Sequence, residues 1–122
     1  MRQVVLDTET TGLDWTQGHR IIEIGCVEIL DRRVSKSYFH TYINPSRAIE
    51  VGAQQVHGIT AEFLADKPVF SKIADEFLDY VAEAELIIHN APFDLGFLNA
   101  EFDILDKSIS PIDAKCPIFD TL

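Results

Sequence analysis

The apolar residues in the first third of the chain follow strand-like patterns. Residues 4–6 form a continuous apolar run, which is typical of a buried strand. Residues 20–30 and 37–43 alternate partially between apolar and polar side chains on either side of a short charged break, and this pattern predicts an antiparallel hairpin. The charged residues at that break are interpreted as solvated turn residues: Arg32, Arg33 and Lys36.

The clearest helix of the chain is predicted over residues 70–81. Apolar side chains recur there at offsets 0, 3, 4, 7, 8 and 11, and charged side chains occupy the opposite face. Thr60 can cap a short helix that runs through residue 65. Residues 48–58 have no sustained period, so we expect a connecting segment there.

The remaining patterns complete an α/β arrangement. A short apolar strand at residues 86–88 leads into a helix from residue 90 to about 106, with Pro92 near its start. Residues 112–119 predict a last strand. The order of three strands, helices, strand, helix and strand predicts an α/β domain with a mixed sheet and flanking helices.

Composition indicates one globular domain outside the membrane. The chain has 122 residues, 47% of them apolar, which is enough to build one core. It has no run of about 18 apolar residues, and residues 1–3 lead into a strand rather than a signal peptide, so we expect a cytoplasmic protein. Cys26 and Cys116 lack metal-ligand spacing and are expected to be ordinary thiols.

The formal net charge of −10 argues against a chain that grips nucleic acid by itself, because phosphate contacts need clustered Lys and Arg. An acidic nuclease is compatible with this charge if divalent ions offset its carboxylates and a partner protein holds the substrate.

Two carboxylates, Asp7 and Glu9, emerge where the first strand ends. Side chains of a strand alternate between faces, so both should point to one side and Thr8 to the other. Hard oxygen ligands placed this way suit Mg²⁺ or Mn²⁺, and the chemistry that uses both is metal-assisted attack on a phosphodiester. An Asp-x-Glu pair is also common at strand ends that only face solvent, but the preceding buried strand and the following turn at residues 10–12 favour a metal site.

A third carboxylate, Asp94, falls in the first turn of the helix that follows the strand at residues 86–88. An Asp in this place is often only a favourable charge at the positive end of the helix dipole, which contributes about 0.3–1 kcal/mol. With Asp7 and Glu9 on a neighbouring strand, Asp94 becomes a candidate third metal ligand at the same sheet edge.

Four motifs in order carry a specific resemblance: residues 5–13 (VLDTETTGL), 21–25 (IIEIG), 56–59 (VHGI) and 89–94 (HNAPFD). Together they resemble the DnaQ-like DEDDh exonucleases, the family of the proofreading epsilon subunit of bacterial DNA polymerase III. The likeness runs from residue 2 to about residue 122.

The resemblance implies an RNase H-like fold and a 3′-to-5′ exonuclease that removes mispaired nucleotides from a DNA 3′ end with two Mg²⁺ or Mn²⁺ ions. It implies metal binding by Asp7 and Glu9 and support of the second ion by Asp94, the three catalytic residues. It also implies two protein partners, the polymerase catalytic subunit and a small accessory subunit. The residues that it implies for binding the terminal nucleotide are Thr10, Thr11, Gly12, Leu13, His57, Asn90 and Phe93.

The chain departs from the family in its third motif, a histidine followed five positions later by an aspartate on a downstream helix. All four histidines precede Asp94. His89 and Asp94 have that separation, but their setting marks them as the second motif. Asp120 or Thr121 can cap a further helix, so we expect residues 1–122 to form a single exonuclease domain that is incomplete at its C-terminal end.

Two consequences of an incomplete domain are expected. Loss of a positioned general base typically lowers the rate by about 10²–10⁴, so the activity of this chain should be low or undetectable. An apolar sheet face left uncovered should promote association.

Two other functions stay open at this point. An exoribonuclease of the same superfamily would keep the fold and the chemistry but act on RNA, although residues 56–59 look more like the polymerase subunit. A catalytically incomplete module that only binds a polymerase would explain the missing third motif. Against the second alternative stand three carboxylates retained in one place.

Overall fold

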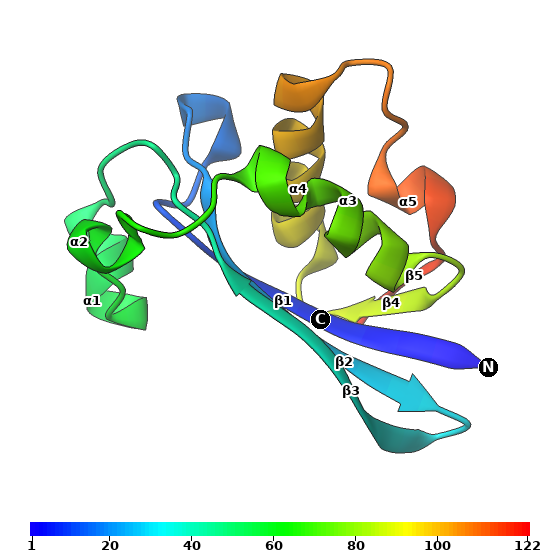
Figure 1. Cartoon of the computed structure of the whole chain (residues 1–122). Helices are drawn as coiled ribbons and strands as arrows, with labels where there is room; N and C mark the ends of the chain where they lie inside the picture. Colours follow the sequence, from blue (N-terminus) through cyan, green and yellow to red (C-terminus); the bar gives the residue numbers. More distant parts are fainter.

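The computed structural model describes residues 1–122 and contains a five-stranded mixed sheet with the order β3-β2-β1-β4-β5 (Figure 1). The central strand β1 pairs antiparallel with β2 and parallel with β4, while β3 and β5 form the edges. This arrangement confirms the predicted α/β class with a mixed sheet. The strands are β1 (Arg2–Thr10), β2 (Ile21–Leu30), β3 (Arg33–Tyr42), β4 (Glu85–Ile88) and β5 (Ile118–Asp120).

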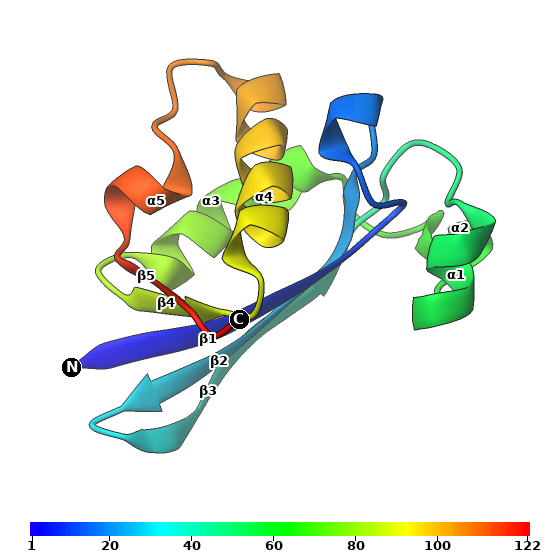
Figure 2. The ribbon, with the colours of Figure 1, turned by 180° about the vertical axis from the view of Figure 1, so that it is seen from behind.

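The helices divide into two groups around this sheet. Three of them cover one face, whereas the other two lie beyond the end of the sheet at which β1 finishes (Figures 1 and 2). The covering helices are α3 (Phe70–Val81), α4 (Ala91–Leu105) and α5 (Ile112–Lys115). The end helices are α1 (Val51–His57) and α2 (Ala61–Leu64), and a short 3-10 helix, η1 (Trp15–Gln17), lies in the loop between β1 and β2.

Several predicted elements are confirmed with their physical causes. The β2–β3 hairpin turns at Asp31 and Arg32, both at positive φ (49° and 70°), as a two-residue hairpin loop requires. Helix α3 has the predicted bounds, and the hydroxyl of Thr60 accepts the Phe63 N–H at 3.1 Å to cap α2.

The structure corrects the prediction for residues 48–58, because Val51–His57 form helix α1. No residue of α1 is buried, so no apolar stripe marks it in the sequence. The signal that remains is Gly58, which ends the helix in the left-handed conformation at φ 72°.

The structure also corrects the prediction of one strand over residues 112–119. Ile112–Lys115 form a helical turn, and only Ile118–Asp120 pair with β4. The turn forms because the side chain of Asn99 accepts the Ile112 N–H at 2.9 Å and Ile112 is fully buried. Residues 112–115 therefore have a strand-like apolar pattern in the sequence but form a helical turn in the structure.

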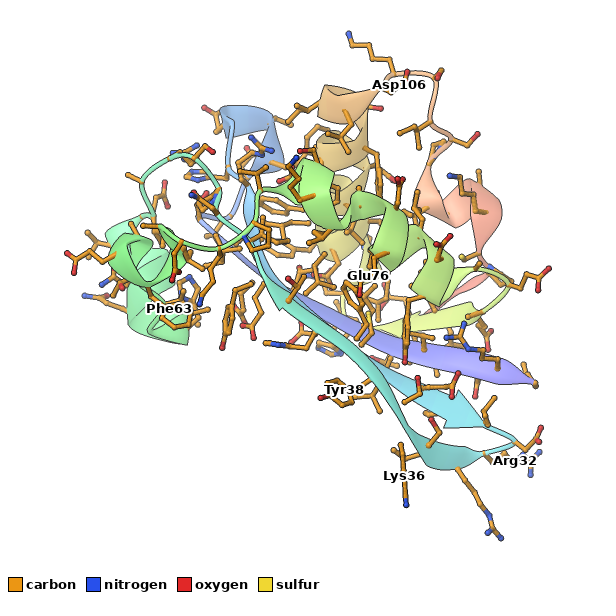
Figure 3. The ribbon with its side chains drawn as sticks, in the orientation of Figure 1. Arg32, Lys36, Tyr38, Phe63, Glu76 and Asp106 are labelled. Carbon is orange, nitrogen blue, oxygen red and sulfur yellow. The ribbon has the colours of Figure 1, made fainter.

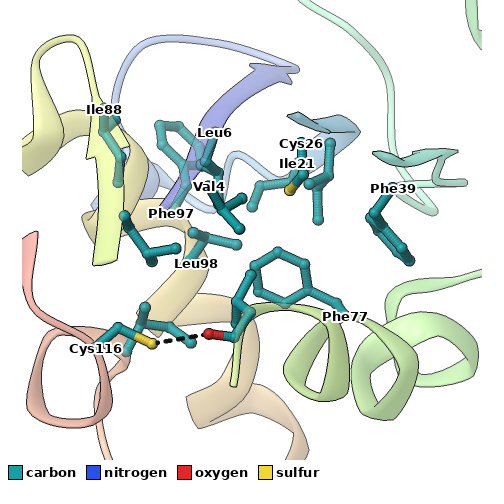
Figure 4. Close-up of a cluster of buried hydrophobic side chains, with 14 of the residues drawn as sticks. Val4, Leu6, Ile21, Cys26, Phe39, Phe77, Ile88, Phe97, Leu98 and Cys116 are labelled. Carbon is teal, nitrogen blue, oxygen red and sulfur yellow. Dashed lines mark hydrogen bonds between the residues drawn. The ribbon is translucent and has the colours of Figure 1, made fainter. Parts of the chain in front are cut away.

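The core lies between the covered sheet face and helices α3 and α4 (Figure 4). Val4 and Leu6 of β1 pack there with Phe77 of α3 and Phe97 of α4, all nearly without solvent exposure. Complete burial of such an apolar side chain contributes about 1.5–3 kcal/mol to stability. The face of β1 that carries Val4 and Leu6 is thereby fixed toward the helices.

Both cysteines are buried and unpaired. Burial raises the pKa of the Cys26 thiol to about 12, so it stays protonated and unreactive at neutral pH. The Cys116 thiol donates to the Val81 carbonyl at 3.4 Å, as Figure 4 shows.

The opposite face of the sheet carries exposed apolar side chains. Val5, Val27 and Tyr38 are successive cross-strand neighbours and are 38%, 41% and 72% exposed. Figure 3 shows Tyr38 and Lys36 projecting from the hairpin on the side away from the covering helices. Alternation along β1 places Asp7 and Glu9 on this same uncovered face.

No helix in the chain is both long enough and apolar enough to cross a membrane.

Candidate active site

The carboxylates of β1 surround a small polar hollow on the uncovered face of the sheet. Asp7 lies opposite Gly25 of β2, and Glu9 lies opposite Glu23. A Cβ atom at Gly25 would meet no atom within 4 Å, so the missing side chain leaves open space beside Asp7. The resulting cavity has a volume of about 120 Å³ and no hydrophobic residue in its lining.

Asp94 approaches β1 from the other face. It lies in the first turn of α4, which starts directly after β4, the parallel neighbour of β1. Only 3% of Asp94 is exposed, and the Thr8 hydroxyl donates a hydrogen bond to its carboxylate. Because side chains alternate along β1, Thr8 points toward Asp94 on the face covered by the helices. Asp7 and Glu9 point to the uncovered face.

The electrostatics of these carboxylates indicate a local excess of negative charge. The pKa of Asp94 is raised to about 6: burial is the main cause, the charges of Asp7 and Glu9 add to it, and the hydrogen bond from Thr8 opposes it. Burial is also the main cause of the raised pKa of Glu9, followed by the charge of Asp7. The three carboxylates therefore interact, although they come from two faces of the strand.

These carboxylates suit a divalent cation by charge and by donor type. All are hard oxygen donors, the ligands that Mg²⁺ and Mn²⁺ prefer, and a cation would offset the negative charge that they concentrate here. The structure brings no three His, Cys, Asp or Glu side chains close enough to hold one ion between them. The residues fit metal binding by chemistry, with Asp7 and Glu9 on one side of β1 and Asp94 on the other.

A larger cavity of about 380 Å³ opens next to Glu9. One wall is the loop after β1, with Gly12 and Leu13, and the other is α1, with Ala53 and Val56. Phe93 closes it from the start of α4. A cavity of this size, with apolar walls and a carboxylate at one end, can accept a nucleotide beside the carboxylates.

Most of the residues expected to bind a nucleotide line this cavity, and two do not. The lining includes Thr10, Gly12, Leu13, His57 and Phe93. The structure instead buries Thr11 completely within the loop. It places Asn90 in the left-handed conformation (φ 64°) at the start of α4, outside the lining.

His57 is fixed by hydrogen bonds through both ring nitrogens. Its Nδ1 accepts the Ile59 N–H at 3.0 Å, so its Nε2 carries the proton and donates to the Thr10 carbonyl at 3.1 Å. Glu9 and His57 both line the cavity of about 380 Å³. His57 therefore joins α1 to the end of β1.

Sequence reasoning missed two contacts that position the site. The carboxylate of Asp120 accepts the N–H groups of Asn90 and Ala91 at 3.0 and 3.1 Å and so caps α4, whose own N-cap side chain makes no such bond. Glu101 of α4 is 2% exposed and binds Arg20 through two bonds of 2.6 and 2.8 Å. The paired residues are 29 to 81 positions apart in the chain, so no local sequence pattern predicts these contacts.

A family profile described as "Exonuclease" (RNase_T) matches residues 4–122, almost the whole chain. The chain belongs to this exonuclease family. Its carboxylate-lined strand end and the adjoining cavity are therefore the features to compare with other members.

The exonuclease domain is similar to several curated epsilon subunits. It is 55% identical over 125 residues to "DNA polymerase III subunit epsilon" of Buchnera aphidicola subsp. Acyrthosiphon pisum, covering 99% of this chain and 52% of that protein. It is 50% identical to the subunit of the same name from Escherichia coli strain K12, again over 99% of this chain and 51% of the relative. The chain thus spans about half the length of the curated relatives it matches.

Solved structures agree on the fold. Exonuclease X in complex with 5′ overhanging duplex DNA is 30% identical, with a TM-score of 0.61 over 75% of this chain and 51% of the other. A product-bound structure of exonuclease I has a TM-score of 0.83 over 99% of this chain and 30% of the other, at 17% identity. The second likeness shows the shared fold alone.

Proposed function

We propose that this exonuclease domain hydrolyses nucleotides from DNA 3′ ends and proofreads newly made DNA as the epsilon-type subunit of a bacterial DNA polymerase III. The observation that carries the proposal is the cavity of about 380 Å³ that ends at Glu9, beside the carboxylates of β1. A terminal nucleotide in this cavity would have its phosphodiester next to Asp7 and Glu9. The epsilon subunits that the chain resembles support DNA as the substrate.

Asp7, Glu9 and Asp94 are the residues that would hold two Mg²⁺ or Mn²⁺ ions. The bound ions would supply an activated water and stabilise the leaving oxygen of the phosphodiester. The hydrogen bond from Thr8 orients Asp94 toward β1. The Thr8 N–H also donates to Asp7 at 3.0 Å, which fixes the direction of that carboxylate.

The walls of the cavity would bind the sugar and base of the terminal nucleotide. Leu13 and Val56 are 82% and 85% exposed, so each can cover an apolar base or sugar face without disturbing the core. Phe93 offers a ring from the start of α4. His57 holds Thr10 and the end of β1 in place, which keeps Glu9 at the end of the cavity.

The polymerase subunit names of the relatives support two further parts of the proposal. The DNA 3′ end would be single-stranded or frayed, because a nucleotide must be unpaired before it can enter a cavity of this size. The polymerase catalytic subunit and a small accessory subunit would be the protein partners. A partner that grips the DNA would also compensate for the net charge of −10.

One observation favours a second candidate, a module that binds a polymerase without catalysing hydrolysis. No three potential ligands surround one ion site in this chain. A binding module would need the fold but not a complete metal centre.

The deciding experiment is release of mononucleotides from 3′-labelled single-stranded DNA in Mn²⁺, with a matched RNA oligonucleotide beside it. Asp7→Ala should abolish the release, whereas the control Asp75→Ala, on the exposed face of α3, should leave it unchanged. Faster cleavage of RNA would overturn the DNA assignment. Release that is undetectable with this chain and with a longer chain of the same gene would favour the binding module.

A further inference from the structure

We propose that His19 is a positioning residue that holds the two walls of the nucleotide cavity at a fixed separation and thereby sets the affinity for a terminal nucleotide. The proposal rests on the proposed function, since it assigns the cavity to a nucleotide. His19 lies outside the lining of the cavity and outside the four motifs of the sequence.

His19 connects the loop after β1 to the start of α1. Its ring is 8% exposed, with Nδ1 at 2.8 Å from the Thr11 hydroxyl and Nε2 at 3.0 Å from a carboxylate oxygen of Glu50. Thr11 belongs to one wall segment, and Glu50 is the N-cap residue of α1, the other wall. A single buried side chain therefore spans both walls.

The directions of these hydrogen bonds are mutually consistent. The Thr11 hydroxyl oxygen accepts the Arg20 N–H at 3.0 Å, so its own proton is available for Nδ1 of His19. Nε2 of His19 then donates to the Glu50 carboxylate, a charge-assisted bond. The Glu50 N–H in turn donates to the Thr11 carbonyl at 2.8 Å, which closes a ring of contacts between the two walls.

The loop is shaped to receive the His19 ring. A Cβ atom at Gly12 would lie 2.5 Å from ring atoms of His19, closer than any real contact. Only glycine allows the ring to sit against this part of the loop. Gly12 also lines the cavity, so a displaced ring moves the wall itself.

Helix α1 depends on such polar contacts for its position. None of its residues is buried, so apolar packing does not fix it against the sheet. Polar contacts tie it at both ends, through Glu50 and His19 at the start and through His57 and the Thr10 carbonyl at the end. Loss of the His19 contact leaves only the bond from the Glu50 N–H to the Thr11 carbonyl at the start of α1, so this end of the wall should loosen while the core stays intact.

The test is binding of dTMP in the presence of Mn²⁺, measured by calorimetry on this chain and on His19→Ala. Loss of a charge-assisted tie predicts a Kd about tenfold higher. Binding of Mn²⁺ alone should change less than about twofold, because His19 contacts none of the three carboxylates.

The matched control is Glu101→Gln, which weakens the tie of the same loop to α4 through Arg20 but touches neither wall. It should lower the Tm at least as much as His19→Ala and leave the Kd for dTMP within about twofold. Gly12→Ala, which displaces the ring without removing it, should repeat the loss of affinity.

Three results would overturn the inference. They are an unchanged Kd in His19→Ala, an equal loss of affinity in Glu101→Gln, and a folded Gly12→Ala that binds dTMP normally. If the unaltered chain binds Mn²⁺ but no dTMP, the nucleotide assignment of the cavity itself fails, and the inference fails with it.

Discussion

The substitution Asp94→Asn should stabilise the metal-free chain at neutral pH. Burial raises the pKa of Asp94 from its ordinary value of 3.8 to about 6 in the folded chain. A difference of this size corresponds to roughly 3 kcal/mol at about 1.4 kcal/mol per tenfold change in the ionisation constant. Asparagine keeps an oxygen that can accept from Thr8, so we expect a net gain of about 2–3 kcal/mol at pH 8.

The gain has a defined pH window. An acid whose pKa is raised in the folded state stabilises the fold fully below its unfolded pKa and loses that contribution as the pH rises through the folded value. For Asp94 the loss develops between 3.8 and about 6. Asparagine does not ionise, so the advantage of Asp94→Asn should be well under about 1 kcal/mol at pH 4 and should be complete above pH 7.

Urea unfolding in EDTA, followed by the fluorescence of Trp15, the single tryptophan, measures this difference at both pH values. The control Asp75→Asn changes an exposed carboxylate of α3 and should stay within about 0.5 kcal/mol of the unaltered chain. If Asp94→Asn is no more stable than the unaltered chain at pH 8, burial of the ionised Asp94 carboxylate does not destabilise the fold as we expect. A gain equal at pH 4 and pH 8 would equally refute an ionisation effect.

Three further predictions follow from other contacts. Thr8→Val removes the hydroxyl that donates to Asp94 and should cost about 1–3 kcal/mol at pH 8 in urea unfolding. Hydrogen bonds from the Leu122 N–H, together with those from the start of α4, lower the pKa of Asp120, so its stabilising effect is lost as the pH falls through that lowered value. Asp120→Asn should therefore lower the Tm at pH 7 and have little effect in acid. Sedimentation velocity should show association that increases from about 0.05 to about 1 M salt, as charge repulsion is screened, and Val27→Thr on the uncovered face should weaken it.

The elements that sequence predicted best are those whose side chains face the core with a regular period. The six apolar positions of residues 70–81 mark α3 because most of them are buried against the sheet. Asp7 and Glu9 were predictable for a similar reason, since alternation along β1 fixes their face once Val4 and Leu6 are buried. A regular spacing of apolar residues shows which face of a helix or strand packs against the core. It therefore locates a site residue only when that residue lies on such a helix or strand.

The features that sequence could not predict arise from long-range polar contacts. Helix α1 buries nothing, and its position depends on His19, which is 31 residues away from Glu50 in the chain. The apolar pattern of the sequence also did not predict from which face Asp94 meets β1, because this depends on the parallel pairing of β4 with β1. The sequence pattern predicts one cluster at a sheet edge, whereas in the structure Asp7 and Glu9 lie on the uncovered face of β1 and Asp94 of α4 meets its buried face.

This arrangement gives the carboxylates around β1 two different environments, one buried and one exposed. The buried face of β1 gives Asp94 a low-dielectric surrounding, which raises its pKa. The open face leaves Asp7 exposed to solvent. Because successive residues of β1 point to opposite faces, adjacent positions lie in a buried and in an exposed environment. A register slip of one residue would exchange the two environments, so the exact pairing of β1 with β2 is a requirement of the site as well as of the fold.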